Sequence, residues 1–212
     1  MSVTEQPLAA RMADTLVRTG AIAFRTAPFF RLTSGVESPV YVDNRQLLGH
    51  VRERLEVIDA MVGAVSTQDP PAAVAGTATA GVPWGAWLAD RLALPFLYVR
   101  SQAKAWGKER AVEGFAPQSS RVLVIEDLAF SAGSLLAAAE NLREAGFLVE
   151  DALTIASYEL PDAHARMDTL GLRHTTLTTI DEALAAAARA GSLDEEQVSL
   201  VRDWLMQRRS GG

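Results

Sequence analysis

Short apolar runs alternate with helical patterns through the middle of the chain, and this alternation limits the possible folds more than any other feature. The apolar runs are AAVAG, PFLYVR, RVLVIED and VEDALTIASY, and the helical patterns are PWGAWLADRLA and SLLAAAENLREAG. Buried strands that alternate with helices form a parallel sheet whose two faces are both covered. The sequence therefore predicts an α/β fold with a central parallel sheet flanked by helices. HTTLTT would add an edge strand.

The segments on either side of this pattern extend the predicted fold. Residues 7–19 have helical spacing that ends at Gly20, and residues 51–66 are helical again. Two short antiparallel strands are expected between residues 21 and 45, where Ser34-Gly35 and Ser38-Pro39 signal turns. IDEALAAAARAG and DEEQVSLVRDWL predict C-terminal helices, with Asp181 and Asp194 as their N-caps.

Composition excludes several classes of protein. The 212 residues include no cysteine, which rules out disulfides and thiolate metal sites and fits a reducing cytoplasm. The three histidines share no metal-ligand spacing, and the net charge of −6 does not favour nucleic acid as a partner. The first twenty residues do not resemble a signal peptide, and no apolar run is long enough to span a membrane.

One stretch carries the strongest chemical signal: RVLVIEDLAFSAGSLLAAAE, residues 121–140. Glu126 and Asp127 are expected at the carboxyl end of a strand, where ligands of parallel sheets bind. The small residues that follow would let backbone amides approach an anion at a helix N-terminus. Two acids beside an anion site suit a ligand that also carries hydroxyls, such as a sugar phosphate with associated magnesium. Equally open is a structural alternative, in which the acids cap the strand and the serines cap the helix.

This stretch resembles the phosphoribosyl-pyrophosphate signature of type I phosphoribosyltransferases. Five other segments, in order and spacing, resemble orotate phosphoribosyltransferases of the bacterial type: LTSGVESPVYVDNR, VAGTATAGVP, LPFLYVRSQAKAWGK, VEG and ASYELPDA. The resemblance runs from about residue 15 to about residue 205. It implies the type I phosphoribosyltransferase fold with a small N-terminal hood, as a single domain over residues 1–212. The N-terminal helix and hood would take about 1–50, the α/β core about 51–180, and the C-terminal helices about 181–208.

The resemblance also implies a reaction and a set of site residues. The family joins orotate to phosphoribosyl pyrophosphate with Mg²⁺, giving orotidine 5′-monophosphate and pyrophosphate in pyrimidine biosynthesis. The catalytic residues would be Arg100 and Lys104, on a mobile loop that reaches the neighbouring subunit of a homodimer. The substrate-binding residues would be Thr79, Ala80, Gln102, Trp106, Glu126, Asp127, Leu128, Ala129, Phe130, Ser131, Ala132, Gly133 and Ser134. Magnesium would be held through substrate and water, with no certain protein ligand.

Three of these positions depart from the family pattern. Gln102 stands where lysine is expected, and Trp106 stands where histidine is expected. Phe130 replaces the usual Thr or Ser of the phosphate loop, next to the base. Two alternatives therefore stay open: a phosphoribosyltransferase for a different base, or a weakened, nucleotide- or phosphoribosyl-pyrophosphate-binding paralogue.

Overall fold

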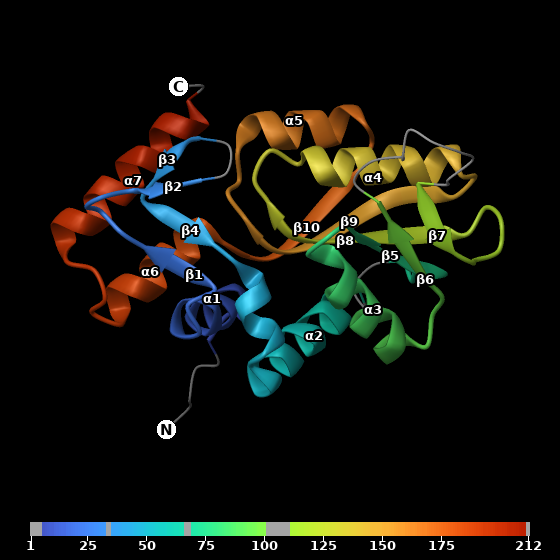
Figure 1. Ribbon diagram of the computed structural model, residues 1–212, viewed down its shortest axis with the longest axis horizontal. Coiled ribbons are helices and arrows are strands. Elements are labelled where there is room, and N and C mark those ends of the chain that lie inside the picture. Colours follow the sequence, from blue (N-terminus) through green and yellow to red (C-terminus); the bar gives the residue numbers. More distant parts are fainter. Residues whose placement is uncertain (1–5, 33–34, 66–68, 101–110, 211–212) are drawn as a thin grey trace.

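The computed structural model describes residues 6–32, 35–65, 69–100 and 111–210. At its centre lies a six-stranded sheet in the order β10-β9-β8-β5-β6-β7, with helices on both faces (Figure 1). All neighbouring strands are parallel except β6 and β7. The predicted parallel sheet is confirmed, including the edge strand from HTTLTT. The strands are β5 (Ala73–Thr77), β6 (Phe96–Val99), β7 (Val112–Gly114), β8 (Arg121–Ala129), β9 (Leu148–Ser157) and β10 (Arg173–Thr179).

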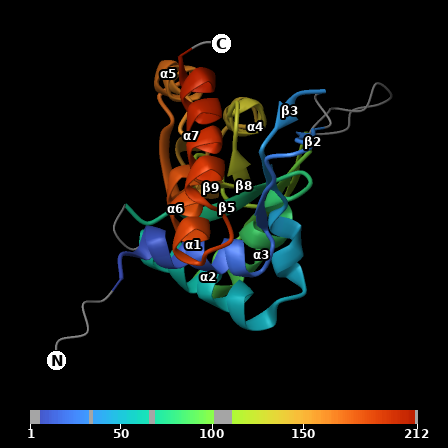
Figure 2. The ribbon, with the colours of Figure 1, turned by 90° about the vertical axis from the view of Figure 1, so that its left-hand side faces the viewer.

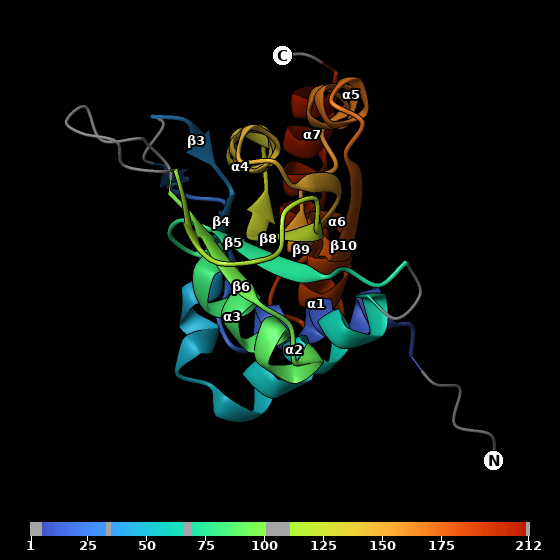
Figure 3. The ribbon, with the colours of Figure 1, turned by 90° about the vertical axis from the view of Figure 1, so that its right-hand side faces the viewer.

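Alternating side chains of the sheet form two cores, one on each face. Leu123 and Ile125 of β8 belong to a core shared with α1, α2, α3, α6 and α7. Val122 and Val124 belong to a second core with α4 and α5. Figure 3 shows α4 and α5 on one side of the sheet and α1, α2 and α3 on the other. The helices are α1 (Leu8–Arg18), α2 (Val51–Val65), α3 (Gly81–Leu92), α4 (Gly133–Glu144), α5 (Pro161–Thr169), α6 (Ile180–Arg189) and α7 (Glu195–Arg209).

The N-terminal hood contains more strands than the sequence pattern predicts. Four short strands form two antiparallel pairs, where two strands were expected. Each pair is only two or three residues long, which is too short for a clear alternation of side chains. The strands are β1 (Ile22–Phe24), β2 (Phe30–Arg31), β3 (Glu37–Ser38) and β4 (Val40–Val42), followed by the 3₁₀ helix η1 (Asn44–Leu48).

Helices α1, α6 and α7 stand together beside the β10 edge of the sheet (Figure 2). The Thr178 hydroxyl of β10 donates to the carbonyl of Ala9 in α1 at 2.8 Å. Asp194 caps α7 as predicted, accepting from the Gln197 amide at 2.8 Å. The prediction for Asp181 is wrong, because the Thr179 side chain caps α6 and Asp181 lies in the first turn.

Two elements that follow the hood were not predicted at all. The polar stretch after β6 ends in strand β7, whose three residues are too few for a recognisable pattern. Helix α5 begins at Pro161, inside a segment that carried only a family resemblance. Among the described helices, none has both the length and the apolar composition needed to cross a membrane.

Candidate active site

The strand order creates a crevice between β5 and β8. From β5 the chain moves through α3 to β6 on one side, and later returns to β8 on the other side of β5. Ligands of open parallel sheets bind at such a reversal, beyond the carboxyl ends of the strands. The segments at this position are the loop after β5 and the end of β8, which are the two segments that the sequence singled out.

Gly81 lets the loop after β5 lie close to β8, and two further glycines allow close packing of β5 on α3. A Cβ on Gly81 would collide with the Ile125 carbonyl oxygen and would lie 2.5 Å from Thr77 Oγ1. Gly76 and Gly85 leave similar room where β5 packs on α3. The Thr77 hydroxyl donates to the Ile125 carbonyl at 3.2 Å, next to the acids. The GTATAG segment therefore lies beside the start of the acid pair, with Thr79 exposed and Ala80 at the N-cap of α3.

Glu126 and Asp127 form a crowded pair of carboxyl groups. Glu126 is buried, with 5% of its surface exposed, and its Oε1 accepts from the Asp127 amide at 3.0 Å. Burial raises the pKa of Asp127 to about 7, and the negative charge of Glu126 adds to the rise. An acid pair in this state is suited to accept hydrogen bonds from hydroxyl groups, because such donors offset the cost of holding two charges together.

The acids do not stand at the end of their strand, in contrast to the expectation from the sequence. Strand β8 continues through Leu128 and Ala129, which pair with Ala156 and Ser157 of β9. Ala129 is buried, so the ladder continues past the acids with apolar support. Leu128 and Ala129 are thus strand residues, and the turn begins at Phe130.

The loop of residues 130–132 leads directly into α4. Ala132 adopts a left-handed conformation with φ of 57° and is the N-cap residue of the helix. Its methyl side chain accepts no hydrogen bond, so the alternative in which serines cap this helix is wrong. The first-turn amides remain oriented toward a possible anion. Ser131 and Ser134 are exposed, Gly133 begins the helix, and Phe130 is half-buried.

A cavity of about 260 Å³ joins these segments. Thr77 and Ala78 line it from the β5 loop, Arg100 from the end of β6, and Gly133 and Ser134 from α4. Arg100 also forms an ion pair with Glu113 of β7. The cavity therefore combines a cation, a hydroxyl and a helix N-terminus, a set of groups that suits a phosphorylated ligand. Gln102, Lys104 and Trp106 lie outside the described residues.

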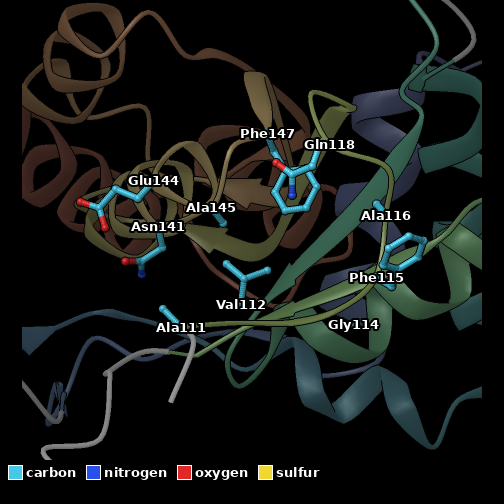
Figure 4. Close-up of a pocket in the computed structure, with 10 residues that line it drawn as sticks. All are labelled: Ala111, Val112, Gly114, Phe115, Ala116, Gln118, Asn141, Glu144, Ala145 and Phe147. Carbon is cyan, nitrogen blue, oxygen red and sulfur yellow. The ribbon is translucent and has the colours of Figure 1, made fainter. Parts of the chain in front are cut away.

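A larger cavity, of about 640 Å³, lies elsewhere, between β7 and the C-terminal half of α4. Figure 4 shows Val112 and Phe147 on its apolar side and Asn141 and Glu144 on α4. It contains neither the acids nor the loop after β5. Volume alone therefore does not identify the reaction site in this fold.

Sequence reasoning missed Thr77 and Ala78, which line the smaller cavity, and also Asn44. This side chain is fully buried at the start of η1, and its Nδ2 donates to the Asp127 carbonyl oxygen at 2.8 Å. The polar triplet DNR, directly after the apolar strand β4, was the available signal. Local motifs cannot connect it to β8, because 83 residues separate the two partners.

The described residues fit a magnesium ion that arrives with its ligand. Among them, no cluster of three or more acidic or histidine side chains could hold a metal ion. Glu126 and Asp127 supply two carboxyl groups, and no third acidic or histidine side chain among the described residues completes a metal site with them. Burial also raises the pKa of Asp127 and so disfavours its charged form. This donor set suits indirect contact through water and substrate hydroxyls better than direct coordination.

Comparison with known proteins identifies the class to which this crevice belongs. Residues 43–165 match the phosphoribosyl transferase domain, and this range contains η1, the β5 loop and the acid pair. The chain belongs to the phosphoribosyltransferase family, and its helix-flanked sheet is the type I fold of that family.

Its relatives define the particular group within this family. The orotate phosphoribosyltransferase of Bacillus caldolyticus is 39% identical over 91% of this chain and 94% of its own length. The crystal structure of orotate phosphoribosyltransferase from Aeropyrum pernix has a TM-score of 0.74 at 32% identity, covering 86% of this chain and 99% of that one. The UMP synthase of Leishmania donovani has a TM-score of 0.80 at 25% identity, but this chain covers only 42% of it. The chain is a member of the orotate phosphoribosyltransferase group, as the ordered motifs predicted.

Proposed function

We propose that the protein transfers the phosphoribosyl group of phosphoribosyl pyrophosphate to orotate, giving orotidine 5′-monophosphate and pyrophosphate in pyrimidine biosynthesis. The observation that carries this proposal is the crevice between β5 and β8, where Arg100, the GTATAG loop and the start of α4 line one cavity, and where β8, the neighbour of β5, carries the two acids. Relatives that cover most of the chain carry the name of this activity.

Different residues of the crevice bind different groups of phosphoribosyl pyrophosphate. Glu126 and Asp127 accept hydrogen bonds from the ribose hydroxyls, while the amides of residues 130–134 and the Ser134 hydroxyl hold the 5′-phosphate. Thr79 and Ala80 face the pyrophosphate. Each assignment places a hydrogen-bond donor against an anion or an acceptor against a hydroxyl.

The chemical step separates positive from negative charge. The anomeric carbon becomes cationic as its bond to pyrophosphate breaks, and the base nitrogen attacks it. Arg100 and Lys104 stabilise the negative charge that grows on the leaving pyrophosphate. The base is the nucleophile, so the protein needs to supply no covalent intermediate. Magnesium, when bound to the pyrophosphate, adds further charge stabilisation.

Several features of the working enzyme belong to this proposal. We expect the chain to act as a single domain, in a homodimer whose sites are completed across the interface. The cysteine-free composition is consistent with a cytoplasmic enzyme. Gln102 and Trp106 would contact the pyrophosphate by hydrogen bonding, without the charge that the family pattern provides.

Phe130 favours one alternative, a phosphoribosyltransferase for another base. A phenyl ring stands where a hydroxyl is usual, so the base side of the pocket loses a hydrogen-bond partner. Structures of relatives include an adenine phosphoribosyltransferase from Thermoanaerobacter pseudethanolicus, which at 20% identity supports the shared fold only.

A steady-state assay separates these possibilities. The purified protein is given phosphoribosyl pyrophosphate, Mg²⁺ and one of five bases: orotate, uracil, adenine, guanine or hypoxanthine. Pyrophosphate release is the common readout. We expect turnover with orotate alone, and a large loss in the Arg100→Ala variant. Turnover of another base alone would replace the proposed substrate. Binding of phosphoribosyl pyrophosphate without turnover of any base would indicate that the protein is a sensor and not an enzyme.

A further inference from the structure

Asn44 links the hood to the strand that carries the acids. Its side chain has no exposed surface, and its Nδ2 lies 2.8 Å from the carbonyl oxygen of Asp127. It is the first residue of η1, and only Asp43 separates it from the hood strand β4. A single buried amide thus connects two segments that are remote in sequence, at the residue proposed to hold the ribose.

The chemistry of the bond fixes the orientation of the Asn44 amide. A carbonyl oxygen only accepts hydrogen bonds, so the nitrogen of the amide must face Asp127. The amide oxygen, Oδ1, is then buried, and it has no hydrogen-bond partner among the described residues. Leaving a buried acceptor without a partner is costly. Such a cost is tolerated where a residue serves a site, since a simple packing role would favour an apolar side chain of the same size.

The segment around Asn44 is firmly held. Asp43 donates its backbone amide to the Ala21 carbonyl at 2.7 Å, and its side chain pairs with Arg45 at 2.6 Å. Leu47, at the other end of η1, is fully buried in the core. Asn44 is therefore anchored on both sides, and its amide can hold β8 at a defined position.

We propose that Asn44 is a positioning residue, which fixes the backbone of β8 at Asp127 and so aims the acid pair at the ribose hydroxyls of phosphoribosyl pyrophosphate. This inference rests on the proposed function. It assigns to Asn44 no contact with the base and no part in the chemical step.

Two variants test the role of the amide. Asn44→Ala removes the donor, and Asn44→Asp places an oxygen against the Asp127 carbonyl. Asn141, a half-buried asparagine on α4 that lines the remote cavity in Figure 4, gives the matched controls Asn141→Ala and Asn141→Asp. For each protein, kcat and the KM values for both substrates are measured, together with the Kd for phosphoribosyl pyrophosphate with Mg²⁺. Circular dichroism reports the folded fraction.

The expected result is selective for one substrate. Asn44→Ala should raise KM and Kd for phosphoribosyl pyrophosphate about fivefold, the value of one hydrogen bond, and Asn44→Asp more than about tenfold. The KM for orotate, measured at saturating phosphoribosyl pyrophosphate, should change less than about twofold. Both Asn141 variants should match the wild type.

Other outcomes overturn the inference. If Asn44 has only a structural role, its variants lose kcat in proportion to the unfolded fraction and keep both KM values. If the wild type binds phosphoribosyl pyrophosphate but turns over no orotate, the proposed function fails, while the Kd comparison still tests Asn44. If neither Asn44 variant folds, hydrogen exchange on the wild type decides. Phosphoribosyl pyrophosphate should then protect residues 43–48 and 125–129, and unchanged exchange in both segments would reject the positioning role.

Discussion

The ring of Phe130 meets the ring of Tyr158 edge-on, with centroids 4.8 Å apart and an interplanar angle of 90°. Tyr158 is buried, and its carbonyl oxygen accepts from the Arg209 guanidinium in the last turn of α7. Phe130 is therefore anchored toward the core and the C-terminal helix. In this arrangement the ring supports the loop of residues 130–132, and stacking on a base would require the ring to leave Tyr158.

Replacing Phe130 by serine tests this supporting role. Phe130→Ser should lower the free energy of unfolding by about 2 kcal/mol. The variant loses the edge contact with Tyr158 and the buried part of the phenyl ring. Thermal or denaturant unfolding measures the change. Tyr158→Phe, which keeps the ring pair, should lose less than half as much. The assay of the same variants with five bases shows whether the restored hydroxyl alters base choice. Unchanged stability in Phe130→Ser would mean that the ring pair contributes nothing.

The close approach of α3 to β8 makes a second prediction, at Gly81. A methyl group there would collide with the Ile125 carbonyl oxygen, which is backbone and cannot rotate away. Gly81→Ala should therefore cost about 3 kcal/mol or more of unfolding free energy and displace the GTATAG loop, with loss of activity. Chemical denaturation and the steady-state assay measure both effects.

Gly63 provides the matched control for this substitution. It lies on an exposed face of α2, where a Cβ would meet no atom within 4 Å. Gly63→Ala should stabilise the protein by about 0.5 to 1 kcal/mol, through helix propensity, and leave activity unchanged. Similar behaviour of the two variants would show that the close contact at Gly81 does not decide the loop position.

Sequence patterns predicted the sheet well because its strands are buried on both faces. RVLVIED contains the unbroken apolar run VLVI, and VEDALTIASY contains ALTIA, so both strands can be recognised without knowledge of their partners. Strands β2 and β7 escaped prediction because a strand of two or three residues is defined by its neighbour rather than by its own pattern. The length of β8 was underestimated for the same reason, since its pairing with β9 carries it beyond Asp127.

The site residues also differ in how far the sequence could predict them. The acids and the loop of residues 130–134 are contiguous, so their residue types suggested a ligand with phosphate and hydroxyl groups, with a structural role equally open until the family resemblance was added. Asn44 depends on a contact across 83 positions, and the pairing of Arg100 with Glu113 depends on the hairpin of β6 and β7. Such contacts follow from topology and not from local spacing.

A half-buried histidine, His174, predicts loss of stability in acid. Burial lowers the pKa of His174 to about 4, while the charge of Glu159 opposes this shift and that of His164 adds to it. The Nε2 atom of His174 lies 2.8 Å from the Thr154 hydroxyl oxygen. The unfolded chain, with a pKa of 6.5, binds this proton more readily. The contribution of His174 is therefore complete above pH about 6.5 and lost as the pH falls toward 4, by up to about 3 kcal/mol.

The variant His174→Gln measures this contribution. The difference in unfolding free energy between wild type and variant should fall steadily from pH 7 to pH 4. His50→Gln, at an exposed position, serves as the control. A constant difference for His174→Gln across this range would mean that His174 takes up a proton as easily in the folded protein as in the unfolded chain.

Asp127 should produce a trend of the opposite sign. In the folded protein its pKa is about 7, whereas the ordinary pKa of an aspartate in an open chain is 3.8. Between these values the folded state binds more protons than the unfolded state, so the unfolding free energy falls as the pH rises through this window. The total is up to about 4 kcal/mol. Because this window overlaps that of His174, the two contributions oppose each other in the wild type, and only variants separate the two groups.

Asp127→Asn removes the ionisable group and keeps its shape. At pH 8 the variant should be more stable than the wild type by about 2 to 4 kcal/mol, and near pH 4 the two should be equal. Its affinity for phosphoribosyl pyrophosphate should nevertheless fall at pH 8, because an amide binds the ribose hydroxyls more weakly than a carboxylate does. Denaturation across the pH range and calorimetry with Mg²⁺ measure the two effects, with Asp162→Asn on the exposed face of α5 as control. A variant that is less stable than the wild type at pH 8 would contradict the burial cost at Asp127. A gain in stability together with lost affinity would mean that the protein gives up folding free energy at this carboxylate in order to bind its substrate.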